Sequence, residues 1–381
     1  MKASSVQRSI IVVIKLARPA ISEEAIQRMG DILRSGNLVQ GPHVRQFEEA
    51  LQGYLSAGNA VVVSSGTAAL HLALLALDIR SGDEVLVPAF TFPATANVVE
   101  IVGAKPVLID ISPTDFNMDP AGIEKAITNR TRAVMVVHEF GQAADMDVIA
   151  GIAAAHGLPV LEDAACALGA RWHERSVGTL GTLGCFSFHP RKIVTTGEGG
   201  AVTTDDDSLA RRVRSLRNHG LSILGAPAFE SIGLNYRMTD FQAVLGCCQI
   251  SSLENEIDIR TQQVERYRDG LSSCAWVRTP DTLVGRRHTW QTFCVLLEDG
   301  LDRDRCIALL RQEGIEANLG AQALHALPFY ADKYGYRPSD FPSAWRAFRQ
   351  GLALPVGSHV SDRDIAFICE RLSMIQQHPR H

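Results

Sequence analysis

The chain has 381 residues, enough to bury a large core and, from usual domain sizes, to form two domains. Hydrophobic residues make up 46% of it, which excludes an intrinsically disordered protein. The net charge is −5 and acids and bases are mixed along the chain, which argues against a nucleic-acid-binding surface, so we expect no nucleic-acid partner.

The first half of the chain alternates between helices and short apolar strands. A capping serine, early acids and apolar residues at helical spacing predict a helix over 22–35, and another is expected near 43–54. Strands rich in Val, Ile and Leu are expected over 60–63, 83–90, 105–111, 132–141 and 158–165, with helices between them. This alternation predicts an α/β fold whose mainly parallel sheet is covered on both faces and binds ligands at the carboxyl ends of its strands.

The pattern changes in the second half of the chain. Long helical material is expected over 236–271, and a strand begins near Trp290. We therefore predict a large domain over 1–250 and a smaller C-terminal α+β domain over 251–381.

Cysteine usage and the N-terminus bear on the compartment. The eight cysteines are scattered without the spacing of a zinc site, so we expect no metal and a reducing environment. The apolar stretch 10–14 is too short for a signal peptide, and no run approaches the length of a membrane span. The sequence thus predicts a cytoplasmic protein without a membrane partner.

The segment FSFHPRKIVTTGEGGAVTT, residues 186–204, begins and ends like a strand and holds Lys192 between. Only six of the 37 basic residues are lysine, so a lysine here is noticeable in a chain that otherwise uses arginine. Taken alone, a lysine is usually a surface charge. An amine at the edge of a sheet is also a candidate to form an imine with an aldehyde cofactor.

Two further segments suit the same kind of cofactor. In SSGTAAL, residues 64–70, small residues precede an apolar helix, where backbone amides can hold a phosphate, although such residues are also ordinary helix caps. In VLEDAACALGA, Asp163 ends an apolar strand and needs a cationic partner or a capping role. A protonated pyridine nitrogen would be such a partner, and Phe90 or Phe92 could stack on the ring. Pyridoxal 5'-phosphate (PLP) satisfies all of these features.

The motifs SSGTAAL, VPAFTFPATAN, HEFGQAADMD, LEDAACALGA, FSFHPRKIVTTGEGGAVTT and NYRMTDFQAVLG occur in this order. Together they closely resemble the PLP-dependent sugar aminotransferase family, the DegT/DnrJ/StrS group of fold type I enzymes. The resemblance runs from about residue 20 to the C-terminus. It implies a fold type I PLP-dependent transferase in which Lys192 forms the Schiff base with PLP and carries protons.

The resemblance also implies roles for other residues. Asp163 would pair with the pyridine nitrogen and Phe92 would stack on the ring. The phosphate would be held by Gly66, Thr67 and Ser187. Asn235 would reach the phosphate of the neighbouring subunit, which implies a homodimer with shared active sites.

Three positions bear on the substrate and on the cofactor's phenolic oxygen. Arg237 is expected to contact substrate or brace the dimer, and His325 to contact the sugar or its diphosphate. The resemblance implies that Cys166 stands near the phenolic oxygen, where the family usually has Gln or His. Because a thiol is a poor hydrogen-bond partner, this contact is expected to differ from that of the family.

The expected reaction moves an amino group from an amino acid, glutamate in most relatives, to a nucleotide-linked keto-deoxy-sugar. The product would enter the biosynthesis of an amino sugar for a surface polysaccharide or a secondary metabolite. Two alternatives stay open at this point: a PLP-dependent sugar dehydratase and a non-catalytic PLP-binding regulator. The dehydratases of the family carry histidine where this chain has Lys192, so the aminotransferase is preferred.

Overall fold

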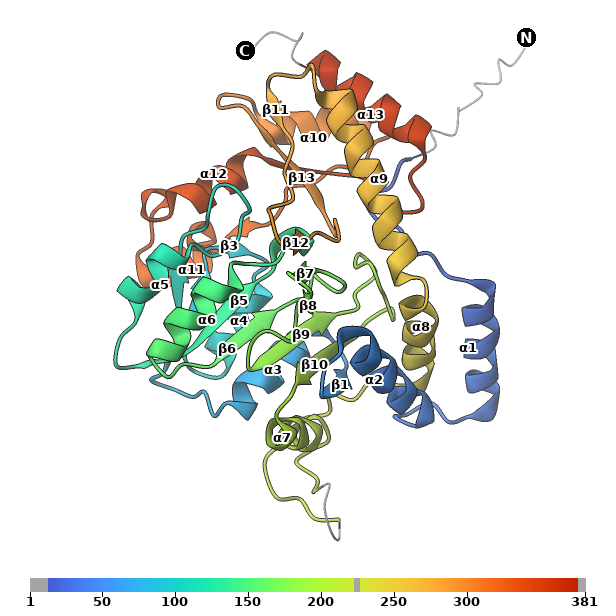
Figure 1. The fold of residues 1–381 in the computed structure, drawn as a ribbon, viewed down its shortest axis with the longest axis vertical. Coiled ribbons are helices and arrows are strands. Elements are labelled where there is room, and N and C mark those ends of the chain that lie inside the picture. Colours follow the sequence, from blue (N-terminus) through green and yellow to red (C-terminus); the bar gives the residue numbers. More distant parts are fainter. Residues whose placement is uncertain (1–12, 223–226, 376–381) are drawn as a thin grey trace, which may run out of the picture.

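The computed structural model of the protein describes residues 13–222 and 227–375 (Figure 1). Of the apolar stretch 10–14, residues 10–12 lie outside this part. Among the described helices, none combines the length and the apolar character needed to cross a bilayer.

A seven-stranded sheet forms the centre of the fold, and all of its strands except β10 run in the same direction. The predicted mainly parallel sheet is therefore confirmed. Its central strands are mostly apolar because both faces are covered; Val85, Leu86 and Val87 are all fully buried. In spatial order the strands are β1 (Asn59–Val63), β10 (Gly200–Thr204), β9 (Leu183–Ser187), β6 (Val160–Asp163), β5 (Thr131–Val137), β2 (Glu84–Pro88) and β4 (Lys105–Ile109).

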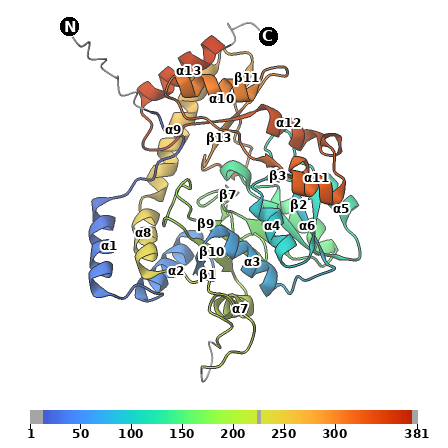
Figure 2. The same cartoon turned by 180° about the vertical axis from the view of Figure 1, so that it is seen from behind.

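Helices cover the two faces of this sheet in separate layers, each with its own apolar core (Figures 1 and 2). The first layer contains α3 (Gly66–Ala76), α4 (Ala94–Ile101) and α7 (Asp207–Arg217). The second layer contains α2 (Pro42–Leu55), α5 (Pro120–Ala126), α6 (Met146–Ala155) and α8 (Asp240–Ile250). The order of strands and helices along the chain matches the alternation read from the sequence.

The predicted N-terminal helix is α1 (Glu23–Ser35), which lies beside α8 (Figure 1). The Ser22 side chain accepts a hydrogen bond from the Ala25 amide at 3.2 Å, and Gly36 ends the helix in the left-handed region. The helical material expected over 236–271 is divided in two, because Ser251 and Ser252 separate α8 from α9 (Leu253–Leu271). Helix α9 then leads away from the large sheet (Figure 2).

The C-terminal part has a smaller antiparallel sheet with a core of its own. Its elements are β11 (Val277–Arg278), β13 (Phe293–Leu297), β15 (Gly351–Leu354), α10 (Arg303–Gln312) and α13 (Asp362–Ile375), which pack with α9. The division at residue 250 remains a prediction. It places the start of α9 at the boundary, although Leu324 and Ala344 of the C-terminal part pack in the core of the large sheet.

The segment that returns to the large sheet contains several short elements. Strand β14 (Gln322–Ala323) pairs with β3 (Phe90–Thr91). The others are the 3₁₀ turns η2 (Leu324–Ala326) and η3 (Pro338–Asp340) and the helices α11 (Pro328–Tyr334) and α12 (Pro342–Gln350). This segment ties the two parts of the chain together beside the carboxyl end of β2.

Candidate active site

The carboxyl ends of β5, β6 and β9 lie side by side at one edge of the large sheet. Val137 at the end of β5 is paired with Asp163 at the end of β6, and Asp163 is paired with Cys185 of β9. The loop between β9 and β10 carries Lys192 to the same edge, where its Nζ donates to Cys166 Sγ at 2.9 Å. Residues predicted from two separate motifs are thus brought together.

The backbone on both sides of Lys192 is held by one side chain, that of Gln291. Its Oε1 accepts from the Ile193 amide at 2.7 Å, and its Nε2 donates to the Arg191 carbonyl at 2.7 Å. Gln249 Oε1 accepts from the Thr195 amide at 2.8 Å. Neither glutamine is predicted from the sequence, because both stand far from the lysine loop in the chain and carry no motif of their own. They fix the loop so that the flexible lysine side chain starts from a defined position.

Asp163 is a buried carboxyl with few partners; its side chain is 4% exposed. Oδ2 accepts from the Thr95 hydroxyl at 2.8 Å, and Oδ1 accepts from the Ala165 amide at 3.2 Å. Burial raises the pKa of Asp163 above its ordinary value, while Thr95, the Ala165 amide and the Lys192 charge oppose that rise. A cation beside this carboxylate would relieve the cost of its burial.

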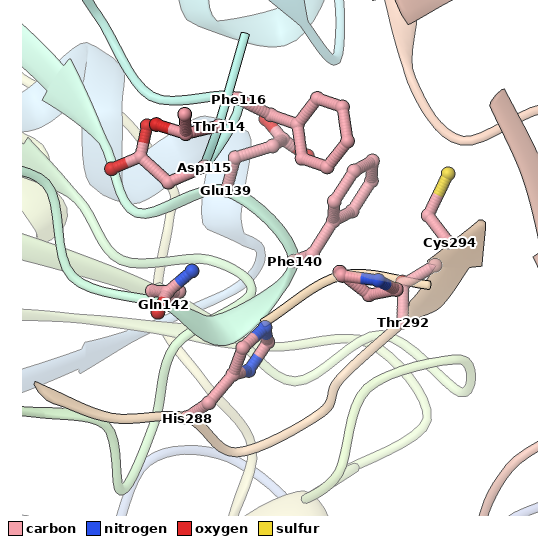
Figure 3. Close-up of a pocket in the computed structure, with 10 residues that line it drawn as sticks. Thr114, Asp115, Phe116, Glu139, Phe140, Gln142, His288, Thr292 and Cys294 are labelled. Atoms are coloured by element: carbon pink, nitrogen blue, oxygen red, sulfur yellow. The ribbon is translucent and has the colours of Figure 1, made fainter. Parts of the chain in front are cut away.

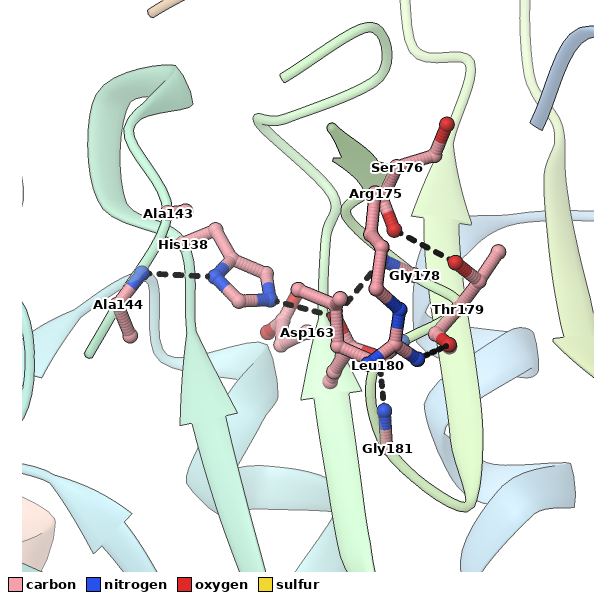
Figure 4. A network of polar contacts seen from close by, with 12 residues as sticks. His138, Ala143, Ala144, Asp163, Arg175, Ser176, Gly178, Thr179, Leu180 and Gly181 are labelled. Atoms are coloured by element: carbon pink, nitrogen blue, oxygen red, sulfur yellow. Dashed lines mark hydrogen bonds and ion pairs between the residues drawn. The ribbon is translucent and has the colours of Figure 1, made fainter. Parts of the chain in front are cut away.

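Glu162, the neighbouring residue on β6, belongs to a separate polar network that includes His138 and Gly178, whose positions Figure 4 shows. His138 Nδ1 accepts from the Ala144 amide at 3.0 Å, so in the neutral ring Nε2 carries the hydrogen and donates to Glu162 at 2.9 Å. The Glu162 carboxylate also accepts from the amides of Gly178, Leu180 and Gly181 at 2.6 to 2.7 Å. These amides follow the hairpin of β7 (Arg171–Trp172) and β8 (Arg175–Ser176), which is extended by β12 (Arg286–Arg287). Glu162 therefore fixes this hairpin and has no capacity left for a ligand.

The N-terminus of α3 forms a cradle next to the end of β9. The Ser65 side chain caps the helix by accepting from the Ala68 amide at 3.0 Å. A Cβ at position 66 would come within 2.7 Å of Ser187 Cβ, so only glycine allows this approach. Thr67 is exposed and Ser187 is half-buried, so both hydroxyl groups are available where the helix dipole attracts an anion.

The two phenylalanines near the site differ in exposure. Phe90 is 1% exposed and packs against Phe116 and Phe140, so it belongs to the core. Phe92 follows β3 and is 64% exposed. Only Phe92 therefore offers a ring face for stacking.

The other predicted residues lie in varied surroundings. Asn235 is exposed, and Arg237 donates from Nη1 to the Asn218 side chain at 2.6 Å, in a segment that runs beside the end of β1. His325 is fully buried beside Phe341 and Trp345, and burial lowers its pKa. The neighbouring-subunit and substrate contacts of these three residues remain predictions.

Glu139 is a further acidic residue of the site that the sequence analysis did not single out. It opens η1 (Glu139–Gly141), two residues after the end of β5, and is 4% exposed. Its Oε2 has no hydrogen-bond partner among the described residues. Burial, together with the charge of Asp163, raises the pKa of Glu139 to about 8, while the charge of Lys192 opposes this. The signal in the sequence is an acid at the end of an apolar strand, the same signal that identified Asp163.

These residues fit PLP. Asp163 is a buried carboxyl that lacks a charged hydrogen-bond partner, Lys192 Nζ has a thiol as its contact, and the glycine approach at α3 leaves a cradle beside Ser187. The cradle joins the N-terminus of α3 to the end of β9, the carboxyl ends the neighbouring strand β6, and the amine lies on the loop after β9. They match the phosphate, the pyridine nitrogen and the aldehyde of PLP.

Comparisons with known proteins agree with this fit. Residues 19–373 match the model of the DegT/DnrJ/EryC1/StrS aminotransferase family. GDP-perosamine synthase of Caulobacter vibrioides is 39% identical over 338 residues, which cover 88% of this chain and 90% of that one. UDP-4-amino-4-deoxy-L-arabinose–oxoglutarate aminotransferase of Shewanella sediminis is 38% identical over 336 residues, 84% of this chain and 86% of that one.

Solved structures extend the likeness to the fold. Spr1654 from Streptococcus pneumoniae, solved in its PLP form, superposes with a TM-score of 0.90 at 27% identity, over 96% of this chain and 99% of that one. This confirms the fold class read from the sequence and the cofactor. The chain is therefore a PLP-dependent enzyme that belongs to the DegT/DnrJ/EryC1/StrS aminotransferase family.

Proposed function

We propose that the enzyme transfers an amino group from an amino acid donor, glutamate, to a keto-deoxy-sugar that is linked to a nucleotide. The observation that carries the proposal is the meeting of Lys192, Asp163 and the α3 cradle at one edge of the sheet. The names of the two relatives support the acceptor class, because both name sugars linked to a nucleotide. The oxoglutarate in one of these names supports glutamate, since glutamate becomes 2-oxoglutarate when it gives up its amine. The product would serve the biosynthesis of an amino sugar for a surface polysaccharide or a secondary metabolite.

The chain supplies binding, orientation and proton transfer. When bound, PLP withdraws electrons from the reacting carbon and carries the amino group from donor to acceptor. The Asp163 carboxylate would hold a proton on the pyridine nitrogen, and the Thr95 hydroxyl keeps that carboxylate in place. Gly66, Thr67 and Ser187 would hold the phosphate, and Phe92 would cover one face of the ring.

Lys192 is the proton carrier of the proposed reaction. Its Nζ takes a proton from the reacting carbon of the donor and returns one to that of the sugar. The hydrogen bonds of Gln291 to both neighbours of Lys192 hold the start of the side chain, so that Nζ moves over a short range. Arg237 and His325 are proposed to contact the substrate.

The active enzyme is proposed to be a homodimer in which Asn235 reaches the phosphate of the neighbouring subunit. Support comes from the exposure of Asn235 in the single chain. Mixing two inactive variants tests this directly. Co-expressed Lys192→Ala and Asn235→Ala chains should regain about a quarter of wild-type activity, since half of the dimers are mixed and each contains one intact site. Mixed dimers that stay inactive would contradict the shared site.

The absorption spectrum of the PLP-loaded protein tests the half-reaction with the donor. Added glutamate should bleach the yellow band, and a nucleotide-linked keto-sugar should then restore it. Alanine and aspartate at the same concentration serve as donor controls. A yellow band that persists with glutamate but bleaches with another amino acid would overturn the choice of donor, and a band that no acceptor sugar restores would overturn the acceptor class.

A further inference from the structure

Glu139 occupies a defined position in the order of groups along the active edge. The strands at this edge follow the order β9, β6 and β5. Ser187 ends β9 at the phosphate cradle, Asp163 ends β6, and Glu139 follows β5 on the far side of Asp163 from the cradle. The amide of His138, between Val137 and Glu139, donates to the Asp163 carbonyl at 3.1 Å, which keeps the start of η1 against β6.

The chemistry of PLP determines which part of the ring faces β5. The phosphate-bearing carbon and the hydroxyl-bearing carbon lie on opposite sides of the line from the ring nitrogen to the aldehyde. With the nitrogen at Asp163 and the phosphate beside Ser187, the edge that carries the methyl and hydroxyl groups turns toward β5. The phenolic oxygen is the polar group on that edge.

Few side chains are suited to meet this oxygen. Cys166 lies beside Lys192 Nζ, but burial raises the pKa of its thiol, which stays neutral and is a weak hydrogen-bonding group. Glu139 Oε2, in contrast, is buried and has no partner among the described residues. An unpartnered buried carboxyl is costly as a charge and is favoured in its protonated form, which has an O–H to donate.

The surroundings of Glu139 agree with an unusual environment. The residue lines a small cavity with the aromatic rings of Phe116 and Phe140 and with Cys294 of β13 (Figure 3). The titratable groups that interact electrostatically with Glu139 are Asp163, Lys192, Cys166 and Cys294, and Asp115 and His288 line the same cavity. No arginine or lysine forms an ion pair with Glu139 within the part of the chain that the structure describes.

We propose that Glu139 contacts the hydroxyl-bearing edge of bound PLP and donates a hydrogen bond to its phenolic oxygen. The proposal rests on the cofactor of the site and adds a polar contact to those of Asp163, Lys192 and the phosphate cradle. It assigns to Glu139 a contact that the thiol of Cys166 supplies poorly.

Equilibrium binding of PLP to the apoenzyme tests the contact. Glu139→Met keeps the length of the side chain and removes the donor, so PLP should bind about tenfold more weakly. Glu139→Gln keeps an N–H donor and should stay within about threefold of the wild type. A PLP analogue without the ring hydroxyl should bind the wild type and Glu139→Met with equal affinity, because the contact is then missing in both.

Matched controls separate this contact from a general disturbance. Thr292→Val changes another residue of the same cavity and should leave PLP affinity unchanged. Thermal melts of each apoenzyme check folding, and Glu139→Ala replaces the Met variant if that variant does not fold. The proposal is overturned if removal of the donor leaves PLP affinity within twofold of the wild type, or weakens PLP and the analogue equally. If glutamate failed to bleach the wild-type band, the proposed amino donor would be wrong, but these binding measurements would still test the contact of Glu139 with PLP.

Discussion

The two consecutive acids at the end of β6 serve different regions of the molecule. Glu162 is 0% exposed and accepts hydrogen bonds from three backbone amides and from His138 (Figure 4). Asp163 is 4% exposed and accepts from one hydroxyl group and one amide. Successive side chains of a strand point to opposite faces of the sheet, so the two carboxyls never share partners.

The difference shows how a buried carboxyl is reserved for a ligand. Glu162 accepts enough hydrogen bonds to compensate for the burial of its charge, and these bonds stabilise the hairpin of β7 and β8. Asp163 has fewer donors, and burial raises its pKa. The free energy that Asp163 costs the apoenzyme is therefore available to bind a cation, here the protonated ring nitrogen of PLP.

The largest effect on activity is expected from substitution of Lys192, because this residue supplies the reactive amine of the site that contains Asp163. Lys192→Ala should lower the rate of the donor half-reaction by about 10³- to 10⁴-fold, because the amine that moves the proton is lost. Stopped-flow absorbance with glutamate measures this rate. Lys192→Arg is the control, since it keeps the charge without an amine of suitable basicity, and it should be almost as slow. An arginine variant that works at near wild-type rate would contradict the role of the amine.

The comparison between the two acids predicts that the amide variant of Asp163 loses activity, whereas the amide variant of Glu162 loses stability. Asp163→Asn removes the charge that holds the ring nitrogen protonated, so kcat should fall by about 10²- to 10³-fold. The apoenzyme should stay within about 1 kcal/mol of wild-type stability, because a costly buried charge disappears together with weak contacts. Steady-state kinetics and urea unfolding of the apoenzyme measure the two quantities.

Glu162→Gln is the matched control on the other face of the sheet. It leaves some of the three amides and His138 without a charged acceptor, so the free energy of unfolding should drop by about 2 to 4 kcal/mol. The activity per folded molecule should change by less than about fivefold. If both variants lost activity alike and stability alike, the division of roles between the two acids would be wrong.

The sequence predicted the residues whose role follows from their place in the chain. Asp163 ends an apolar strand, Gly66 begins an apolar helix, and Lys192 lies between two strands, so the parallel sheet brings them to one edge. The contacts of Gln291 and Thr95 were not predicted, because they join segments about 100 and 68 residues apart; Gln291 lies in no motif, and the motif that contains Thr95 does not show which residue its hydroxyl contacts. Side-chain burial, which distinguishes Phe90 from Phe92 and Glu162 from Asp163, likewise depends on the packed fold.

Glu139 gives the apoenzyme a dependence of stability on pH. Its pKa rises from 4.5 in the unfolded chain to about 8 in the folded one, so between these values unfolding releases a proton. The contribution of Glu139 to stability is therefore full below pH 4.5 and is lost as the pH rises toward 8, by at most about 1.4 kcal/mol per pH unit. Urea unfolding of Glu139→Gln should show a shallower decline with pH than the wild type. Equal slopes for the two proteins would mean that Glu139 is ionised in the folded apoenzyme.

The smallest effect is expected at Cys166, although its Sγ lies 2.9 Å from Lys192 Nζ. Burial raises the pKa of the thiol, so the contact joins an amine to a neutral, weakly polar group, and Cys166→Ser should change kcat/KM by less than about threefold. The same protonation predicts slow alkylation of the apoenzyme at pH 7, with a rate that rises with pH, as followed by mass spectrometry. A loss of tenfold or more in the serine variant would instead show that the thiol controls the protonation of Lys192. The site around Asp163 would then depend on a contact with sulfur, in contrast to the network around Glu162.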